Sequence, residues 1–203
     1  MLVITDRMDA AMVDGGFVRK KARWRRHTPE LPIVVFQEQA RAGGPLYGFT
    51  ILFGYPHRNP DEWGCFQISQ GEACRRQRGH YYDLSTASER EQIEQDFLQF
   101  TAPMAARFHS GRELTAALIA GDVPLSSPTR GQTGLVKDVY DVADAHDVSE
   151  ARMYALTLAR TLDSSRRTRS QIRELASFRP EIEEALDAKS PAPPRHRWWR
   201  SGR

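Results

Sequence analysis

The chain has little cysteine: Cys65 and Cys74 are the two in 203 residues. Two cysteines do not form the disulfide framework on which small secreted proteins depend, so both are expected to be reduced thiols. The first residues, Met-Leu-Val-Ile-Thr-Asp-Arg, place an acid where a signal peptide has a basic start and an apolar stretch. These two absences predict a cytoplasmic protein.

Long apolar runs are also missing. The longest are residues 33–36 and 47–55, which fall far short of the roughly 20 residues that a membrane-spanning helix needs. The sequence therefore predicts no transmembrane segment. The hydrophobic fraction of 40% and the charged fraction of 27% are typical of a folded globular protein.

The motifs that mark common catalytic and metal sites are absent. The chain contains no Gly-x-Ser-x-Gly, P-loop or dinucleotide-binding pattern, and no Cys-x-x-Cys or His-x-x-x-His pair. We therefore predict no catalytic residue, no metal ligand and no cofactor. An enzyme of another type stays open, although the sequence leans against it.

Positive charge is concentrated in two segments. Residues 189–203 carry five basic residues and residues 19–26 carry six, and neither segment contains an acid. The net charge of the whole chain is +3, so the rest of the chain is acidic overall. The two basic segments are the first candidates for contact with a partner.

Alternating and short apolar runs predict an antiparallel sheet in the first half of the chain. Strict alternation over residues 17–26 places Val18, Ala22 and Trp24 on one face and the basic residues on the other. Further strands are predicted at residues 33–39, 46–55, 63–69 and 80–84. The short connections favour a sequential meander of four or five strands.

Helical periodicity dominates elsewhere. Capping-box patterns at Ser88 and Ser110 predict helices that begin there, and Pro103 is expected to kink or divide the first of them. The other predicted helices are residues 2–14, 134–146, 149–163 and 168–187. The predicted fold is α+β: a four- to five-stranded, mainly antiparallel sheet covered by helices, with a C-terminal helical extension.

This pattern predicts three parts. Residues 1–125 form an α+β domain, residues 134–188 a helical extension packed on it, and residues 189–203 a basic, Trp-containing tail. The loop over residues 122–133, rich in Pro, Ser and Gly, is the expected internal boundary.

Three basic segments are candidates for binding a partner or an anion, because Arg binds carboxylates and phosphates in a forked geometry and aromatic side chains stack on bases. They are the strand stripe, an Arg-rich run before the last strand, and the tail. Their residues are Arg19, Lys21, Arg23, Arg25, Arg75, Arg76, Arg78, Arg197, Trp198, Trp199 and Arg200. For each segment a plain alternative stays open: an edge strand protected by charge, a loop that pairs with acids of the body, and a passive tail.

Part of the chain resembles domain-of-unknown-function family 4304. The resemblance covers roughly residues 1–125, and its elements are Gly16-Phe17, Lys20-Lys21, Trp24-Arg25-Arg26, Phe36-Gln37, Cys74-Arg75-Arg76-Gln77-Arg78, Pro103 to Phe108 and Glu113-Leu114. Where that family often has a Trp pair after the Arg run, this chain has Tyr81-Tyr82. The resemblance implies a shared fold and no particular reaction.

The predicted function is a non-enzymatic protein-binding module of bacterial type, with an immunity partner of a toxin as the candidate. The alternative is a nucleic-acid-binding protein that uses the basic strand and the Trp-Arg tail. The sequence does not predict an oligomeric state.

Overall fold

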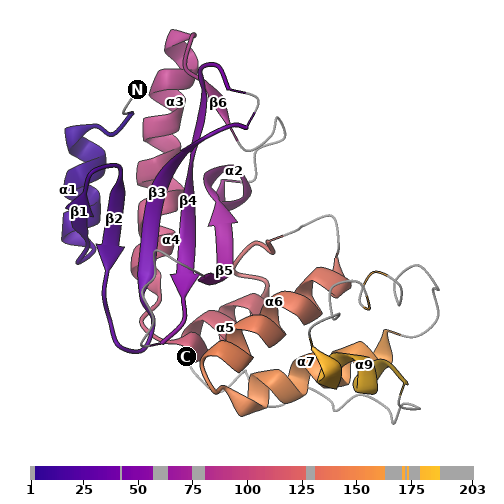
Figure 1. Cartoon of the computed structure of the whole chain (residues 1–203). Coiled ribbons are helices and arrows are strands. Elements are labelled where there is room, and N and C mark those ends of the chain that lie inside the picture. The colour runs from indigo at the N-terminus through magenta and orange to yellow at the C-terminus, as the bar shows by residue number, and fades with distance from the viewer. Residues whose placement is uncertain are drawn as a thin grey trace. The chain divides into compact units, whose positions relative to one another are not determined.

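The computed structural model describes residues 3–41, 43–56, 64–74, 81–126, 131–162, 171, 173 and 179–187. The chain divides into two compact units, Met1–Gly111 and Arg112–Arg203. An antiparallel sheet and helices make up the first unit, and the elements described in the second are helices. The predicted α+β class is confirmed (Figure 1).

The sheet of the first unit has six strands within the described ranges. They are β1 (Val18–Lys20), β2 (Arg23–Arg26), β3 (Ile33–Gln39), β4 (Leu46–Gly54), β5 (Gly64–Ser69) and β6 (Tyr82–Asp83). Strands β1 to β5 are neighbours in chain order and β6 pairs with β4, every pair being antiparallel. The predicted meander is thus confirmed, with one more strand than expected because residues 17–26 form two strands instead of one.

The first unit also contains helices, of which α3 and α4 lie behind the sheet in Figure 1. They are α1 (Asp6–Asp14), the short α2 (Gln70–Ala73), α3 (Ala87–Asp96), the π-helical turn η1 (Phe97–Thr101) and α4 (Ala102–Arg107). Because α3, η1 and α4 follow one another without a break, they act as one long element across the sheet. Their buried side chains include Ile93, Phe97 and Ala105.

Threonine side chains cap the N-termini of α1 and α3. Thr5 accepts a hydrogen bond from the Met8 backbone nitrogen at 3.3 Å, and Thr86 accepts one from the Glu89 nitrogen at 3.3 Å. The prediction that Ser88 begins α3 was therefore wrong by two residues, because Thr86 with Glu89 forms an equivalent Thr-x-x-Glu pattern. An N-cap residue lies just before the first helical residue, whereas Ser88 lies inside the first turn of α3.

The division expected at Pro103 takes the form of the π turn. The turn ends at Thr101, and Pro103 lies in the first turn of α4, where its missing N–H costs little. A π turn inserts one extra residue into a helix and is frequent at functional sites. Phe97, the first residue of the turn, and Phe108, which follows α4, are both buried.

Aromatic side chains fill the space between sheet and helices. The ring centroids of Trp24, Phe49 and Phe97 lie 4.7 to 5.9 Å apart in pairs, and Phe53 contacts Phe66 and Phe108 at 5.8 and 6.0 Å. Such tilted, edge-on and stacked pairs stabilise the core beyond the burial of the rings. One face of the sheet therefore belongs to the core, and this fixes which side chains of each strand point away from it.

The second unit contains α5 (Gly111–Ala120), α6 (Gln132–Ala145), α7 (Ser149–Thr161) and α9 (Pro180–Asp187). The ranges of α6 and α7 agree with the prediction, and α9 covers the end of the predicted helix 168–187, most of whose first half lies outside the described residues. By contact, α5 belongs to this unit and not to the first. α7 begins at Ser149 and its N-cap residue is Val148. In the ranges that the structure describes, no helix is long and apolar enough to cross a membrane.

Candidate functional site

The basic segment at residues 19–26 is a hairpin. Strands β1 and β2 pair with Val18 opposite Arg25, Arg19 opposite Trp24 and Lys20 opposite Arg23. Two residues, Lys21 and Ala22, form the turn, with Lys21 in the left-handed region at φ 59°. The prediction of one continuous strand was wrong, since a two-residue turn reverses the chain and shifts the alternation by one.

Cross-strand partners lie on the same face of a sheet, so the turn sorts the cations differently from the prediction. Arg19 shares the core-side face with Trp24, whereas Lys20, Arg23 and Arg25 share the other face with Val18. We call these four residues the outer face of the hairpin. Lys21 lies in the turn, so the predicted stripe of Arg19, Lys21, Arg23 and Arg25 does not form a single face.

The inner face of the hairpin is fastened to α1 through Asp9. The Trp24 indole nitrogen donates a hydrogen bond to Asp9 Oδ1 at 2.7 Å, and an Arg19 guanidinium nitrogen lies 3.5 Å from Asp9 Oδ2. Arg19 Nε also donates to the Lys21 carbonyl oxygen at 3.1 Å. Arg19 is therefore committed to contacts within the protein.

Arg26, the last residue of β2, is 7% exposed and lies under the sheet. Its guanidinium donates hydrogen bonds to the carbonyl oxygens of Ala106, at 3.0 Å, and Phe108. The same group lies 5.1 Å from the centre of the Phe17 ring. The last carbonyls of a helix lack partners within it, so a cation at this position satisfies them and complements the helix dipole. Arg26 thus joins β2 to the end of α4.

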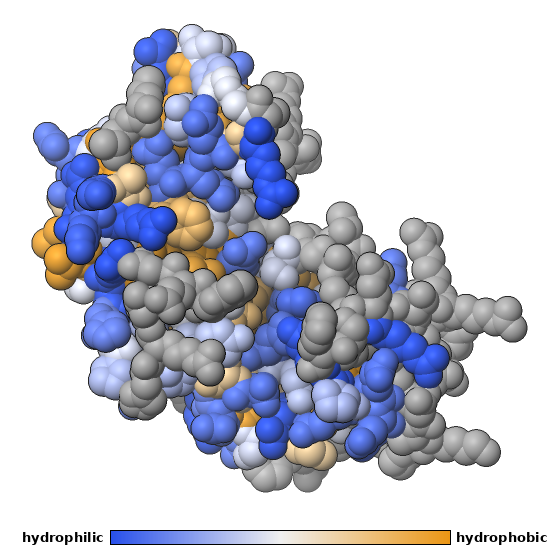
Figure 2. All heavy atoms as spheres, in the orientation of Figure 1, coloured by the Kyte–Doolittle hydropathy of each residue, from blue (hydrophilic) through white to orange (hydrophobic). Residues whose placement is uncertain are grey.

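The outer face points away from the helices of the first unit. Val18 is 71% exposed, Lys20 and Arg23 are exposed, and Arg25 is half-buried. The Arg23 guanidinium lies 5.8 Å from the centre of the Phe36 ring on β3. Figure 2 shows this side of the strands, with apolar surface bordered by hydrophilic residues. The outer face therefore combines cations with apolar groups.

A carboxylate limits this cationic surface. Register places Glu38 on the same face as Arg23 and Phe36, further along β3. Glu38 accepts a hydrogen bond from the Thr50 hydroxyl at 2.8 Å. Burial, followed by the charge of Glu38, raises the pKa of Tyr81. A negative charge thus borders the cations of the outer face on β3.

The other candidate segments from the sequence fall outside the described residues. Arg75, Arg76 and Arg78 belong to one such range, and Arg197, Trp198, Trp199 and Arg200 to another. Of the predicted site residues, the structure places Arg19, Lys21, Arg23 and Arg25.

Sequence reasoning missed a buried polar cluster around Asp96, at the end of α3. The Tyr82 hydroxyl donates to Asp96 Oδ2 at 2.6 Å, Gln92 donates to Asp96 Oδ1 at 2.7 Å, and Cys74 Sγ lies 3.6 Å from the Tyr82 oxygen. Burial, together with these hydrogen bonds, raises the pKa of Tyr82, so the phenol stays protonated and donates to the carboxylate. A signal existed: Asp96 interrupts the apolar face between Ile93 and Phe97.

The arrangement around Asp96 explains why it does not form an active site. Tyr82 is completely buried and Asp96 nearly so, so a substrate has no access to either group. The amide of Gln70, also completely buried, donates to the Ile93 carbonyl at 2.9 Å just before the π turn. The cluster therefore holds β6, α2 and α3 together.

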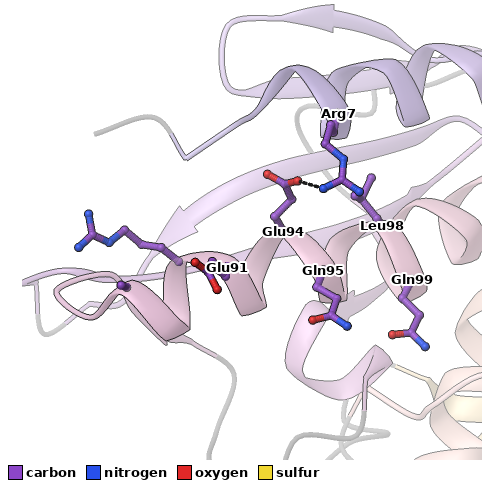
Figure 3. Close-up of a pocket in the computed structure, with 8 residues that line it drawn as sticks. Arg7, Glu91, Glu94, Gln95, Leu98 and Gln99 are labelled. Carbon is purple, nitrogen blue, oxygen red and sulfur yellow. Dashed lines mark hydrogen bonds and ion pairs between the residues drawn. The ribbon is translucent and has the colours of Figure 1, made fainter.

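A surface hollow of about 860 Å³ lies between α1 and α3. Figure 3 shows Arg7 reaching from α1 to Glu94, with a nitrogen–oxygen distance of 2.8 Å. The residues that line the hollow are Arg7, Ala87, Arg90, Glu91, Glu94, Gln95, Leu98 and Gln99. Acids and bases are balanced in this hollow, and its best-placed pair is already joined. The hollow thus lacks the converging groups of one charge or one chemistry that a ligand site needs.

In the second unit, Asp138 on α6 is a buried carboxylate, 1% exposed. It accepts hydrogen bonds from the backbone nitrogen of Ser126 at 2.8 Å and from its hydroxyl at 2.6 Å, and Lys137 Nζ lies 3.7 Å away. Burial raises the pKa of Asp138 and outweighs these contacts, which lower it. Nearby, Asp141 pairs with Lys137 and with Arg179, which tethers the start of α9 to α6.

The Asp138→Asn variant is expected to be more stable than the natural protein at neutral pH. A carboxyl whose pKa is raised on folding contributes stability below its unfolded value and loses it as the pH rises. The asparagine amide can still form hydrogen bonds with the backbone nitrogen and the hydroxyl of Ser126, but it carries no charge that burial would penalise. Urea unfolding across the acidic range should show the difference shrinking to zero below the ordinary pKa of 3.8.

The exposed Asp144→Asn variant controls for the general loss of a negative charge from α6. If Asp138→Asn is instead less stable at neutral pH, the hydrogen bonds from Ser126 and the charge of Lys137 outweigh the cost of burial.

Searches for related proteins identified no matching family model, no matching curated protein and no matching solved structure. The resemblance to domain-of-unknown-function family 4304 stays a prediction. Within the described ranges, no group of three His, Cys, Asp or Glu side chains is arranged to hold a metal ion. The molecule is an α+β protein whose most distinctive described surface is the outer face of a basic hairpin.

Proposed function

We propose that the protein is a non-enzymatic protein-binding module whose contact surface includes the outer face of the hairpin. The observation that carries this proposal is the asymmetry of the hairpin. Its inner face is fastened by Trp24 and Arg26, while its outer face presents Lys20, Arg23 and the exposed Val18.

A fastened hairpin supports binding because ordering a flexible surface costs free energy on association. Asp9 holds two residues of the inner face, and Arg26 holds the end of β2. The outer cations are thus presented on a backbone that is already in place. Arginine is also among the residue types that are enriched in interface hot spots.

The kind of partner that we propose is a protein that this module holds in an inactive state, as an immunity protein holds its toxin. Charge segregation supports this, since positive charge on one surface of an otherwise acidic chain favours fast and selective association with a complementary partner. A gene for a toxin next to the gene for this protein would support the proposal further.

Nucleic-acid binding is the second candidate, and the cations of the outer face are the observation that favours it. Three features weigh against it. The ring of Phe36 is already in contact with Arg23, so it offers no open platform for a base, and Glu38 lies on the same face. Arg19, predicted as part of the stripe, is paired with Asp9.

Photo-crosslinking at Val18 tests the proposal. A photoreactive amino acid at position 18 is expected to capture a protein in the native host. The same amino acid at Val13, which is 56% exposed and lies on α1 in the helical layer, is the matched control. Equal capture at both positions, or no capture, would contradict the proposal, and capture of nucleic acid at Val18 would favour the second candidate.

Charge reversal gives an independent measure. The double variant Lys20→Glu with Arg23→Glu is expected to reduce capture at Val18 on the order of tenfold, because opposed charges across an interface cost binding free energy. The double variant Arg7→Glu with Arg90→Glu changes the net charge equally in the hollow between α1 and α3. If both double variants reduce capture alike, net charge and not this surface explains the effect.

A further inference from the structure

Two polar atoms beside the π turn lack a partner in the protein. Gln70 begins α2 and Thr101 ends the π turn, and both side chains are completely buried. Among the described residues, no group forms a hydrogen bond with Gln70 Oε1 or with Thr101 Oγ1. Because α2 packs against the π turn, the two atoms belong to the same region of the core. Buried polar groups nearly always have a partner, since leaving one without costs free energy.

The orientation of the Gln70 amide is fixed by its nitrogen, which donates to the Ile93 carbonyl oxygen at 2.9 Å. Turning the amide over would place Oε1 against that carbonyl, where two acceptors would face each other. The nitrogen therefore stays on Ile93. The Oε1 acceptor faces another direction and requires a donor there.

The Thr101 hydroxyl is unusual for its place in a helix. A helical threonine hydroxyl commonly donates to a carbonyl oxygen one turn earlier, as that of Thr115 does to Arg112 at 3.0 Å. The π turn is wider, with the Ala102 nitrogen bonded to the carbonyl of Phe97. In this turn the Thr101 hydroxyl makes no such contact with a described residue. It thus has both a donor and an acceptor to offer.

Water has the chemistry that these two atoms require. The amide oxygen needs a donor, whereas the hydroxyl pairs with a donor or an acceptor, and water supplies both. Neither group carries the charge that would hold an ion, and the neighbouring carboxylate of Asp96 already accepts from Tyr82 and Gln92. Buried water typically bonds to polar groups that the protein leaves unsatisfied.

We infer that ordered water is enclosed between α2 and the π turn, where it donates a hydrogen bond to Gln70 Oε1 and forms a second with the Thr101 hydroxyl. This water joins α2 to the helical layer in addition to the bond from Gln70 to Ile93. It is a structural ligand of the core, and the inference does not depend on any function of the hairpin.

Nuclear magnetic resonance of the full chain tests the inference directly. Enclosed water transfers magnetisation to protons beside it with opposite signs in the laboratory and rotating frames, whereas proton exchange gives the same sign in both. Such cross-peaks are expected from water to the side-chain amide protons of Gln70 and to the methyl protons of Thr101. The Gln70 cross-peak should persist in Thr101→Ser, which keeps the hydroxyl, and weaken severalfold in Thr101→Val. Absence of both cross-peaks from the natural protein would overturn the inference.

Stability gives an independent test, because the sign of one effect discriminates. Valine has nearly the shape of threonine, so replacing a hydroxyl that has no partner should leave the protein as stable as before or more stable. Loss of a hydroxyl that bonds water is unfavourable, and Thr101→Val is expected to lower the folding equilibrium constant on the order of fivefold. Urea unfolding measures the change. A Thr101→Val variant at least as stable as the natural protein would overturn the inference.

A double-mutant cycle shows whether the two atoms share the water. Gln70→Met removes the acceptor, so Thr101→Val should change the folding equilibrium constant less than about twofold in that background. Thr115→Val is the control: it removes another completely buried hydroxyl, in the second unit, and its effect should add to that of Gln70→Met. Additive effects of Gln70→Met and Thr101→Val would overturn the shared site. If Gln70→Met does not fold, the magnetic resonance result decides.

Discussion

The Trp24→Ala variant is expected to lose about 3–5 kcal/mol of the free energy of unfolding of the first unit, the range for removing a fully buried large aromatic side chain. Trp24 is completely buried against Phe49 and Phe97, and its indole nitrogen donates to Asp9. Alanine would leave a cavity and remove the hydrogen bond from the indole to Asp9. Urea unfolding followed by circular dichroism measures the loss.

Two variants of the same hairpin calibrate this result. Trp24→Phe keeps an aromatic ring and removes the hydrogen bond to Asp9, so it should cost less than Trp24→Ala, about 1–3 kcal/mol. Val18→Ala changes an exposed residue of the neighbouring strand and should stay within about 0.5 kcal/mol of the natural protein. A Trp24→Ala variant as stable as Val18→Ala would contradict the packing of the hairpin onto the helices.

The Arg26→Met variant is expected to destabilise the first unit by about 2–3 kcal/mol. Methionine replaces the apolar stem but leaves the carbonyl oxygens of Ala106 and Phe108 without their donor, and each buried acceptor left unsatisfied costs about 1–3 kcal/mol. The same unfolding experiment applies, with hydrogen exchange in α4 as a local readout.

Arg23→Met is the matched control for Arg26. It removes the same charge three residues earlier on β2, from an exposed position on the outer face. Its effect on stability should be small, while its effect on partner capture at Val18 should be large. The opposite result, with Arg23 stabilising and Arg26 neutral, would mean that the two faces of the hairpin are assigned the wrong way round.

The strands of the sheet were predictable because they are short, largely apolar runs bounded by turn residues. Ile33, Val34 and Val35 on β3, and Phe49, Ile51 and Phe53 on β4, are all essentially inaccessible to solvent. The meander followed from short connections, which leave no room for a crossover helix.

The hairpin was not predictable for a physical reason. Its turn consists of Lys21 and Ala22, neither of which is a residue that favours left-handed backbone, although Lys21 adopts it. Charges occur on both sides of the turn, so the sequence looks like uninterrupted alternation. One undetected two-residue turn reverses the face of every later side chain, and it moved Arg23 and Arg25 away from Arg19.

The polar cluster was hidden for another reason. Tyr82 and Asp96 are 14 residues apart, and only the folded chain shows that the strand β6 brings the phenol to the end of α3. A carboxylate on an apolar helix face is a recognisable irregularity, but its partner is not visible in the local sequence. The pairing of buried polar groups is a tertiary property.

Strand β4 pairs with three other strands, and this arrangement has an evolutionary consequence. One of its edges is shared by two strands: β5 pairs with its second half, and β6 pairs with Leu46 and Tyr47 in its first half. The chain thus leaves the sheet after Ser69 and returns at Tyr82 to the same edge. The pairs of β4 with β5 and with β6 involve different residues, so substitutions that weaken the pairing of β6 with Leu46 and Tyr47 leave the pairing of β5 in place, and the two halves of this edge can diverge independently.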